Sequence, residues 1–261
     1  MKKLKKKLQR QSLNKDSEKI MAKEILKIGY VVADEDEYAP LRSVADEYSA
    51  KRSDFFTREG HLFTLEKDGK TIEIHSILCG IGMVNAAAAA TFLANKGVDI
   101  LLCSGLSGGI SGIKRGELTV GTKYIEHDFD LTPLGYEMCA KPLQKYIYDA
   151  DKTLTDILTD IYPDLKRGVI VSGDCFVGDN NKKEFLKNTF GAMSCDMESA
   201  AVAYVADLAK IPFAAIRRIS DDAGNDAAES YSEMNNLREE VLVALLFEAV
   251  KRFFDYNILW K

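Results

Sequence analysis

Apolar runs along the chain alternate with stretches of helical period. The β-rich apolar runs predict buried strands at residues 25–33, 61–66, 71–78, 98–103, 118–126, 168–172 and 213–219. Apolar positions at helical spacing predict a helix that begins within 34–37 and runs toward Tyr48, and further helices at 83–96, 142–161, 197–209 and about 232–254. The alternation predicts one α/β domain, a three-layer α/β/α sandwich with a mixed, largely parallel central sheet.

Glycines mark the ends of several predicted strands. Asp68-Gly69 between two β-type runs is a hairpin signal. Gly80 and Gly82 precede an alanine-rich helix, but the third glycine and the downstream acid of a dinucleotide motif are not in place, so a tight turn is the better interpretation. Glycines after the 98–103 strand make a sharp loop or let the backbone approach a ligand, and their place at a strand end favours the ligand.

The net charge of −5 is unevenly distributed. Seven of the 35 basic residues lie in the first fifteen positions, which hold no acid, so residues 16–261 carry −12. This acidic body argues against a nucleic-acid partner, because binding to the phosphate backbone depends on clustered cations. Residues 1–24 are interpreted as a poorly packed basic extension and not as a signal peptide, since no apolar segment follows the charges. Docking of this extension on an anionic surface is the alternative.

The remaining composition is that of a soluble globular protein. Of the 261 residues, 46% are hydrophobic and 29% charged, which suits one large domain at residues 25–261. No apolar run reaches the ~20 residues needed to cross a bilayer, so no membrane partner is expected. Five scattered cysteines and three histidines lack the spacing of a disulfide framework or a zinc site. We therefore expect free thiols in a cytoplasmic enzyme without a metal or cofactor.

Three loops expected at strand ends carry acidic residues. They lie at 34–37, at Asp196 and Glu198, and at Asp221 and Asp222. In an open α/β sheet, ligands bind beyond the carboxyl ends of the strands, so these acids are expected to converge. Carboxyl groups that donate and accept protons suit the cleavage of a glycosidic bond. The structural alternatives are a helix-dipole contact for Glu198 and a turn cap for Asp221.

Seven segments, in this order along the chain, carry a resemblance to a known family. They are Gly29 through Glu37, Gly80 through Ala86, Ser104 through Gly109, His127 through Thr132, Ser172 through Phe176, Asp196-Met197-Glu198 and Ile219 through Ala223. From residue 25 to about 250 the chain resembles the 5′-methylthioadenosine/S-adenosylhomocysteine nucleosidases of the nucleoside phosphorylase superfamily. The resemblance implies a nucleoside phosphorylase-like fold, hydrolysis of 5′-modified adenosines to adenine and a ribose derivative, and a place in nucleoside catabolism and methionine salvage. It also implies a homodimer whose partner completes the 5′ pocket.

The resemblance also implies a role for each matching residue. Asp221 would be the general acid that protonates N7 of adenine, and Glu37 the base for the attacking water. Glu198 would hold the ribose hydroxyls. The other implied substrate-binding residues are Phe176 stacking on adenine, Val177 bonding its edge through the backbone, Met197 under the ribose, Gly108 at the floor, Ser220 beside the general acid and Tyr231 at the 5′ side.

Two other functions remain open at the level of the sequence. The acids at 34–37 would repel a phosphate dianion, so hydrolysis is predicted and a phosphate-dependent purine nucleoside phosphorylase is the nearest alternative. A non-catalytic nucleoside-binding or storage relative is the second. Leu106, Leu134 and Gly224 depart from the family pattern. They leave the preferred substrate open among methylthioadenosine, S-adenosylhomocysteine, 5′-deoxyadenosine and aminodeoxyfutalosine.

Overall fold

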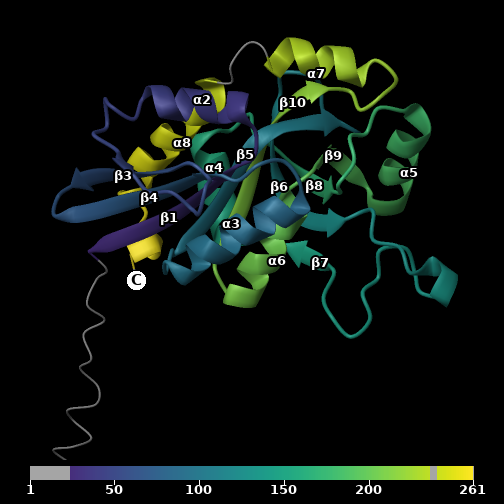
Figure 1. Ribbon diagram of the computed structural model, residues 1–261, viewed down its shortest axis with the longest axis horizontal. Helices are drawn as coiled ribbons and strands as arrows, with labels where there is room; N and C mark the ends of the chain where they lie inside the picture. The colour runs from purple at the N-terminus through teal and green to yellow at the C-terminus, as the bar shows by residue number, and fades with distance from the viewer. Residues whose placement is uncertain (1–23, 236–239, 261) are drawn as a thin grey trace, which may run out of the picture.

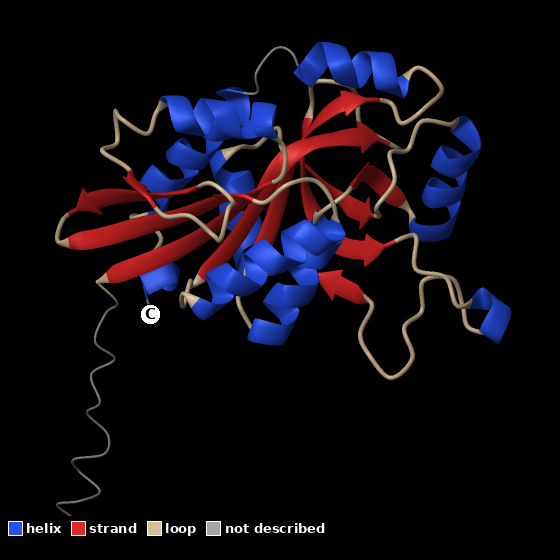
Figure 2. Cartoon of the chain, in the orientation of Figure 1, coloured by secondary structure: helices blue, strands red, loops and turns tan. Residues whose placement is uncertain are grey.

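The computed structural model describes residues 24–235 and 240–260, arranged as drawn in Figure 1. The predicted basic extension, residues 1–24, lies outside the described residues except for Glu24. In the described ranges a mixed sheet lies between two groups of helices, as Figure 2 shows.

The described residues form a ten-stranded sheet. Parallel pairs join β1 to β4 and β5, β5 to β10, and β8 to β6 and β9, whereas β2–β3, β3–β4, β5–β9, β6–β10 and β6–β7 are antiparallel. The strands are β1 (Ile25–Val32), β2 (Lys51–Arg52), β3 (Gly60–Lys67), β4 (Lys70–Leu78), β5 (Ile100–Gly109), β6 (Leu118–Glu126), β7 (Ile147–Asp149), β8 (Lys166–Ser172), β9 (Ala192–Asp196) and β10 (Phe213–Asp221). The prediction of a mixed central sheet is confirmed, but the sheet is not largely parallel, since antiparallel pairings are as numerous as parallel ones.

Part of the sheet closes on itself. The order β5, β9, β8, β6, β10 returns to β5, because β5 pairs with both β9 and β10. Gly108 near the end of β5 is the register partner of Cys195 in β9 and of Asp221 in β10. The two acidic segments that lie far apart in the sequence therefore meet on either side of one glycine.

Helices cover both faces of the sheet, as the three-layer prediction requires. The inward side chains of β1 pack with α2, α4 and α8 in one core. The opposite face packs against α3 and α6 in a second core, and α5 covers β8 and β9. The helices are α2 (Glu35–Ser43), α3 (Met83–Asn95), α4 (Lys152–Ile161), α5 (Asn180–Phe190), α6 (Ser199–Ala209), α7 (Ala227–Asn235) and α8 (Glu240–Phe253), with short 3-10 turns η1 (Thr132–Leu134) and η2 (Asn257–Trp260).

Several predicted elements differ in extent from the observed ones. The helix expected to run toward Tyr48 ends at Ser43, and the helix predicted at about 232–254 overlaps α7 and α8, while 236–239 lie outside the described residues. The helix predicted at 142–161 begins only at Lys152, where Asp151 accepts the N–H of Leu154 at 2.8 Å. The residues before it form β7, because pairing with β6 outweighs their helical spacing. The loop predicted after residue 103 is instead the continuation of β5, since its glycines pair with β9 and β10.

Local turn signals predicted the structure more reliably. β3 and β4 form an antiparallel hairpin, with Asp68 and Gly69 at φ 52° and 79° as a type I′ turn requires. All five cysteines are free. None of the helices in residues 24–235 and 240–260 is long and apolar enough to cross a membrane.

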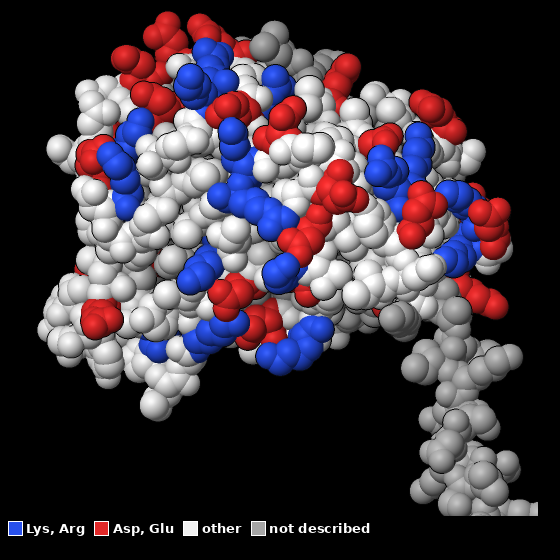
Figure 3. All heavy atoms as spheres, turned by 180° about the vertical axis from the view of Figure 1, so that it is seen from behind, with Lys and Arg blue, Asp and Glu red and all other residues white. Residues whose placement is uncertain are grey.

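The face seen from behind carries charges of both signs. Figure 3 shows lysine and arginine side chains interspersed with acidic ones over this face. Such a mixed surface differs from the clustered cations that bind a nucleic-acid backbone.

Candidate active site

One cavity of about 210 Å³ brings together every site residue that the sequence predicts. It opens where α2, β5, β10, α7 and the loops after β8 and β9 meet. The predicted residues that line it are Glu37, Gly108, Phe176, Val177, Met197, Glu198, Ser220, Asp221 and Tyr231. Their convergence is a geometric finding, and the chemical role of each is taken up below.

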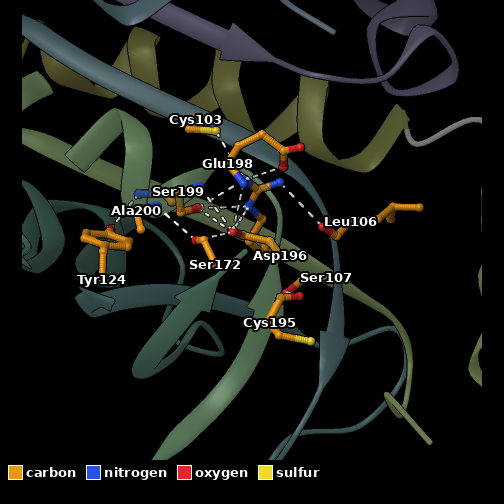
Figure 4. Close-up of polar contacts among 12 residues, drawn as sticks. Cys103, Leu106, Ser107, Tyr124, Ser172, Cys195, Asp196, Glu198, Ser199 and Ala200 are labelled. Carbon is orange, nitrogen blue, oxygen red and sulfur yellow. Dashed lines mark hydrogen bonds and ion pairs between the residues drawn. The ribbon is translucent and has the colours of Figure 1, made fainter. Parts of the chain in front are cut away.

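A buried arginine behind the cavity is missing from the predicted set. Arg217 of β10 is 1% exposed, and its Nε lies 2.8 Å from Asp196 Oδ2 while Nη2 lies 3.3 Å from Glu198 Oε2. Figure 4 shows these two carboxylates together with Ser172 and Ser199. These anions keep the pKa of Arg217 above its ordinary value despite burial. The available signal in the sequence is an arginine in the middle of the apolar strand 213–219, where an unpaired cation is too costly to bury.

Asp196 organises the start of α6. It accepts hydrogen bonds from Ser172 Oγ at 2.5 Å and from the backbone N–H of Ser199 at 3.1 Å, and Ser199 Oγ donates to its second oxygen. With the Arg217 contact, both carboxylate oxygens have partners. Asp196 therefore holds Arg217 and the helix start in place, and with them the neighbouring Glu198.

Glu198 occupies the N-cap position of α6, just before the first helical residue, whereas the predicted helix at 197–209 placed it in the first turn. Its Oε1 accepts the N–H of Gly82 at 3.0 Å, at the start of α3. Burial raises the pKa of Glu198, while Arg217 opposes this shift. The structural alternative for Glu198 was a contact between its carboxylate and the dipole of a helix. The carboxylate makes such a contact with the N-terminus of α3, and the side chain also lines the cavity.

Glu37 is fixed by the backbone of β5. Its Oε1 accepts the N–H of Leu106 at 2.6 Å, whereas Oε2 is buried and has no partner among the described residues. A Cβ built on Gly105 would lie 2.6 Å from Arg217 Nη1 and 2.7 Å from Glu37 Oε2, so only glycine leaves room for both groups. Burial raises the pKa of Glu37 to about 8, against the lowering effect of Arg217. Glu37 can therefore exchange a proton near neutral pH.

Asp221 ends β10 on the other side of Gly108. Its Oδ1 accepts the N–H of Ala223 at 2.8 Å, and its Oδ2 accepts the hydroxyl of Ser220 at 2.6 Å. The first contact is the turn cap that the sequence offered as an alternative. Burial raises the pKa of Asp221. The turn thus orients a carboxyl group whose pKa favours the protonated form more than in water.

The other predicted residues shape the cavity walls. Phe176 is 48% exposed, and its ring centroid lies 5.7 Å from that of Tyr231 in an edge-on contact. Val177 is buried next to it, and Met197 is half-buried. A Cβ on Gly108 would lie 3.0 Å from Cys195 Sγ and 3.1 Å from Asp221 Oδ1, so a side chain at this position would crowd the floor of the cavity. The aromatic pair leaves an open apolar face that suits a flat ligand.

The cavity is acidic. Its lining in the described part of the chain holds five carboxyl groups and no lysine, arginine or histidine; the five are Asp34, Glu37, Asp196, Glu198 and Asp221. No group of three or more metal-ligating side chains is found in residues 24–235 and 240–260. Burial raises the pKa of three of these carboxyl groups, Glu37, Glu198 and Asp221, so the arrangement can donate one proton and accept another.

The chain is similar to known proteins of one superfamily. A model of the Phosphorylase superfamily matches residues 27–255. A 5′-methylthioadenosine/S-adenosylhomocysteine nucleosidase of Exiguobacterium is 31% identical over 217 residues, 80% of this chain and 90% of that protein. An aminodeoxyfutalosine nucleosidase of Campylobacter jejuni is 28% identical over 215 residues, 80% of this chain and 91% of that protein. A crystal structure of a variant Helicobacter pylori methylthioadenosine/S-adenosylhomocysteine nucleosidase, with 5′-methylthioadenosine in its active site, has a TM-score of 0.79 and 26% identity, covering 87% of this chain and 99% of that one.

Proposed function

Because the chain belongs to the 5′-methylthioadenosine/S-adenosylhomocysteine nucleosidase family of the phosphorylase superfamily, we propose that it hydrolyses the N-glycosidic bond of 5′-modified adenosines and releases adenine. The observation that carries this function is the convergence of Glu37, Glu198 and Asp221 on one cavity. The products are adenine and a 5′-modified ribose. This reaction belongs to nucleoside catabolism and methionine salvage, and cytoplasm is the proposed location.

In the proposed mechanism, two carboxyl groups move protons while the C1′–N9 bond breaks. Asp221 donates a proton to N7 of adenine, which makes the base a better leaving group. Water adds its oxygen to C1′, and Glu37 accepts the proton that the water loses. The pKa shifts support these roles: burial raises the pKa of Glu37 to about 8, so it exchanges protons near neutral pH, and burial raises the pKa of Asp221, which favours its protonated, proton-donating form.

Binding contacts hold the sugar and the base in the proposed complex. Glu198 accepts hydrogen bonds from the ribose hydroxyls, and the nearby carboxylates stabilise the positive charge that develops on the sugar ring. Phe176 stacks on adenine and the backbone of Val177 bonds its edge. Met197 packs under the ribose, while Gly108 and Ser220 leave room for the base beside Asp221.

Water is favoured over phosphate as the nucleophile by the charge of the cavity. A phosphate dianion needs cationic partners, but the described lining supplies five carboxyl groups and no basic side chain. Arg217 is already engaged with Asp196 and Glu198. The enzyme is therefore proposed to be a hydrolase, and phosphorolysis is an outcome that the test below distinguishes.

We also propose that the active enzyme is a homodimer. The segment between β6 and β7 extends away from the sheet in Figure 1 and carries large exposed apolar side chains at Leu134, Tyr136 and Leu143. Such a patch favours a protein partner, and a second copy would close the cavity at the 5′ side. Light scattering should give twice the chain mass for the wild type, and Leu143→Asp should shift it toward one chain mass; a monomeric wild type contradicts the proposal.

The reaction is tested by assaying free adenine after incubation with methylthioadenosine, S-adenosylhomocysteine, 5′-deoxyadenosine and aminodeoxyfutalosine. Adenine release that is equal with and without phosphate is the expected result. Release only with phosphate would make the protein a phosphorylase. Tight binding of these nucleosides without any release would make it a non-catalytic binding protein.

A further inference from the structure

One wall of the cavity carries a carboxylate that the proposed proton transfers do not use. Asp34 lines the cavity where β1 gives way to α2. Its Oδ1 caps α2 by accepting the N–H of Asp36 at 2.9 Å. Among the described residues, no cation forms an ion pair with Asp34. Its second oxygen therefore has hydrogen-bonding capacity to offer a ligand.

A hydroxyl group belongs to the same wall. Tyr231 of α7 lines the cavity with its ring edge-on to Phe176. Burial raises the pKa of Tyr231, and the negative charges of Glu37 and Asp34 raise it further. The Tyr231 hydroxyl therefore stays protonated. The effect of Asp34 on this pKa also means that the two side chains are close enough to interact electrostatically. That hydroxyl makes no hydrogen bond to another residue in the described ranges. It can accept a hydrogen bond from a ligand.

The proposed function determines which part of the substrate meets this wall, and the inference rests on it. Phe176 and Asp221 are assigned to adenine and Glu198 to the ribose. The resemblance places Tyr231 at the 5′ side, and Ala33, Asp34 and Ile81 are among the lining side chains without an assigned contact to adenine or ribose. We place the 5′ substituent against these four. This end of the site therefore combines apolar contacts with one carboxylate and one hydroxyl.

We infer that Asp34 and Tyr231 make the enzyme selective for 5′ thioether substituents that end in an ammonium group. An ammonium has three donors and a positive charge, so it pairs with the free carboxylate oxygen and the hydroxyl together. The other carboxylates of the cavity also attract a cation toward it. A neutral methylthio group offers no donor and leaves the Asp34 carboxylate desolvated without a partner.

This selectivity distinguishes the two nucleosides after which the related nucleosidases are named. S-adenosylhomocysteine carries an ammonium group on its 5′ tail, and 5′-methylthioadenosine does not. The enzyme is accordingly expected to have the higher kcat/KM for tails of the first kind.

A matched pair of nucleosides isolates the charge. 5′-(3-Aminopropylthio)-5′-deoxyadenosine and 5′-butylthio-5′-deoxyadenosine have tails of nearly equal length that end in an ammonium or a methyl group. We would measure kcat/KM by adenine release and Kd by calorimetry for both at pH 7. The wild type should prefer the ammonium tail by about tenfold or more, as expected for a charge-assisted hydrogen bond.

Variants then assign the preference to this wall. Asp34→Asn keeps the helix cap, because asparagine caps as well as aspartate, but removes the charge. It should reduce the ammonium preference about tenfold, and Tyr231→Phe should reduce it by a smaller factor. Glu35→Gln removes one charge from the same turn at an exposed residue that pairs with Arg42, and it should leave the preference unchanged.

The outcomes distinguish this inference from the proposed function. Equal kcat/KM and equal Kd for the two tails in the wild type, or a preference unchanged by Asp34→Asn, would overturn the selectivity while leaving hydrolysis intact. The opposite outcome is also possible to recognise. If the wild type binds the ammonium tail more tightly, Asp34→Asn abolishes this difference in Kd, and no nucleoside releases adenine, then the selectivity is supported and hydrolysis is overturned.

Discussion

Arg217 Nη2 lies 3.3 Å from Glu198 Oε2, and both side chains are almost completely removed from solvent. The same guanidinium bonds Asp196 at 2.8 Å, so one buried cation compensates two carboxylates. Glu37 lies beside it with one buried oxygen unpartnered among the described residues. The site therefore stores negative charge next to the cavity where a positively charged sugar would form.

Removing this arginine should destabilise the fold. Arg217→Met would leave Asp196 and Glu198 buried without their cation, and we expect the free energy of unfolding to fall by about 3–5 kcal/mol. Arg115→Met is the control, because Arg115 and Glu233 form an exposed pair at 3.0 Å that contributes about 1 kcal/mol or less. Urea denaturation measures both. Equal stability of the two variants would show that the buried network is not needed.

The two proton-transfer residues should be indispensable for turnover. Asp221→Asn and Glu37→Gln are each expected to lower kcat about 10²–10⁴-fold, the usual contribution of a general acid or base. Asp222→Asn changes the exposed neighbour, which lies 3.6 Å from Lys183, and should retain activity. Steady-state adenine release with methylthioadenosine gives the comparison. If Asp222→Asn lost as much activity as Asp221→Asn, the assignment of Asp221 would be wrong.

Glu37 should also make stability depend on pH. Its pKa rises from the ordinary value of 4.5 to about 8 in the fold, so the folded state binds this proton more tightly than the unfolded state. The resulting stabilisation is complete below about pH 4.5 and is lost as the pH rises through 8. Glu37→Gln has no such proton to lose. We therefore compare the Tm of Glu37→Gln minus that of the wild type at two pH values. This Tm difference should be larger at pH 8.5 than at pH 5.5 by about 2–4 °C or more. A Tm difference that does not change with pH would contradict the raised pKa of Glu37.

Gly82 should be specifically required at the start of α3. It has φ 103°, its N–H donates to Glu198, and a Cβ there would lie 2.8 Å from Asp174 Oδ1. We expect Gly82→Ala to raise KM at least about tenfold, because the clash displaces the backbone that positions Glu198. Gly97→Ala is the matched control: Gly97 follows the same helix at φ 74°, but its Cβ would meet nothing within 4 Å. If both variants had a similarly raised KM, the strain of a non-glycine residue at positive φ would explain the increase, and the clash of Gly82→Ala with Asp174 would not be needed.

Much of the fold follows from local pattern. β1, β4 and β6 begin at or near their predicted positions because continuous apolar runs leave little alternative to a buried strand. Asp68-Gly69 predicts its hairpin because the turn conformation is a property of those two residues. The failures involve tertiary pairing: β7 and the second half of β5 are strands only because β6, β9 and β10 lie beside them.

The candidate site was predictable to the extent that it consists of residues after strand ends. Glu37, Glu198 and Asp221 could be named from their motifs, and the structure brings them to one cavity. Their hydrogen-bond partners could not, since the N–H groups of Gly82 and Leu106 reach them only because β1 pairs with β4 and β5, and β5 with β9. Arg217 was missed because a charged residue within an apolar strand gives no indication of which distant carboxylates will pair with it.

The most direct test of the central claim is the fate of oxygen from the solvent. The enzyme would be incubated with methylthioadenosine in ¹⁸O-labelled water containing unlabelled phosphate, and the sugar product analysed by mass spectrometry against an enzyme-free control that measures exchange. Direct attack by water predicts a free 5′-methylthioribose that gains one ¹⁸O atom as it forms. A ribose 1-phosphate derivative without the label would contradict hydrolysis.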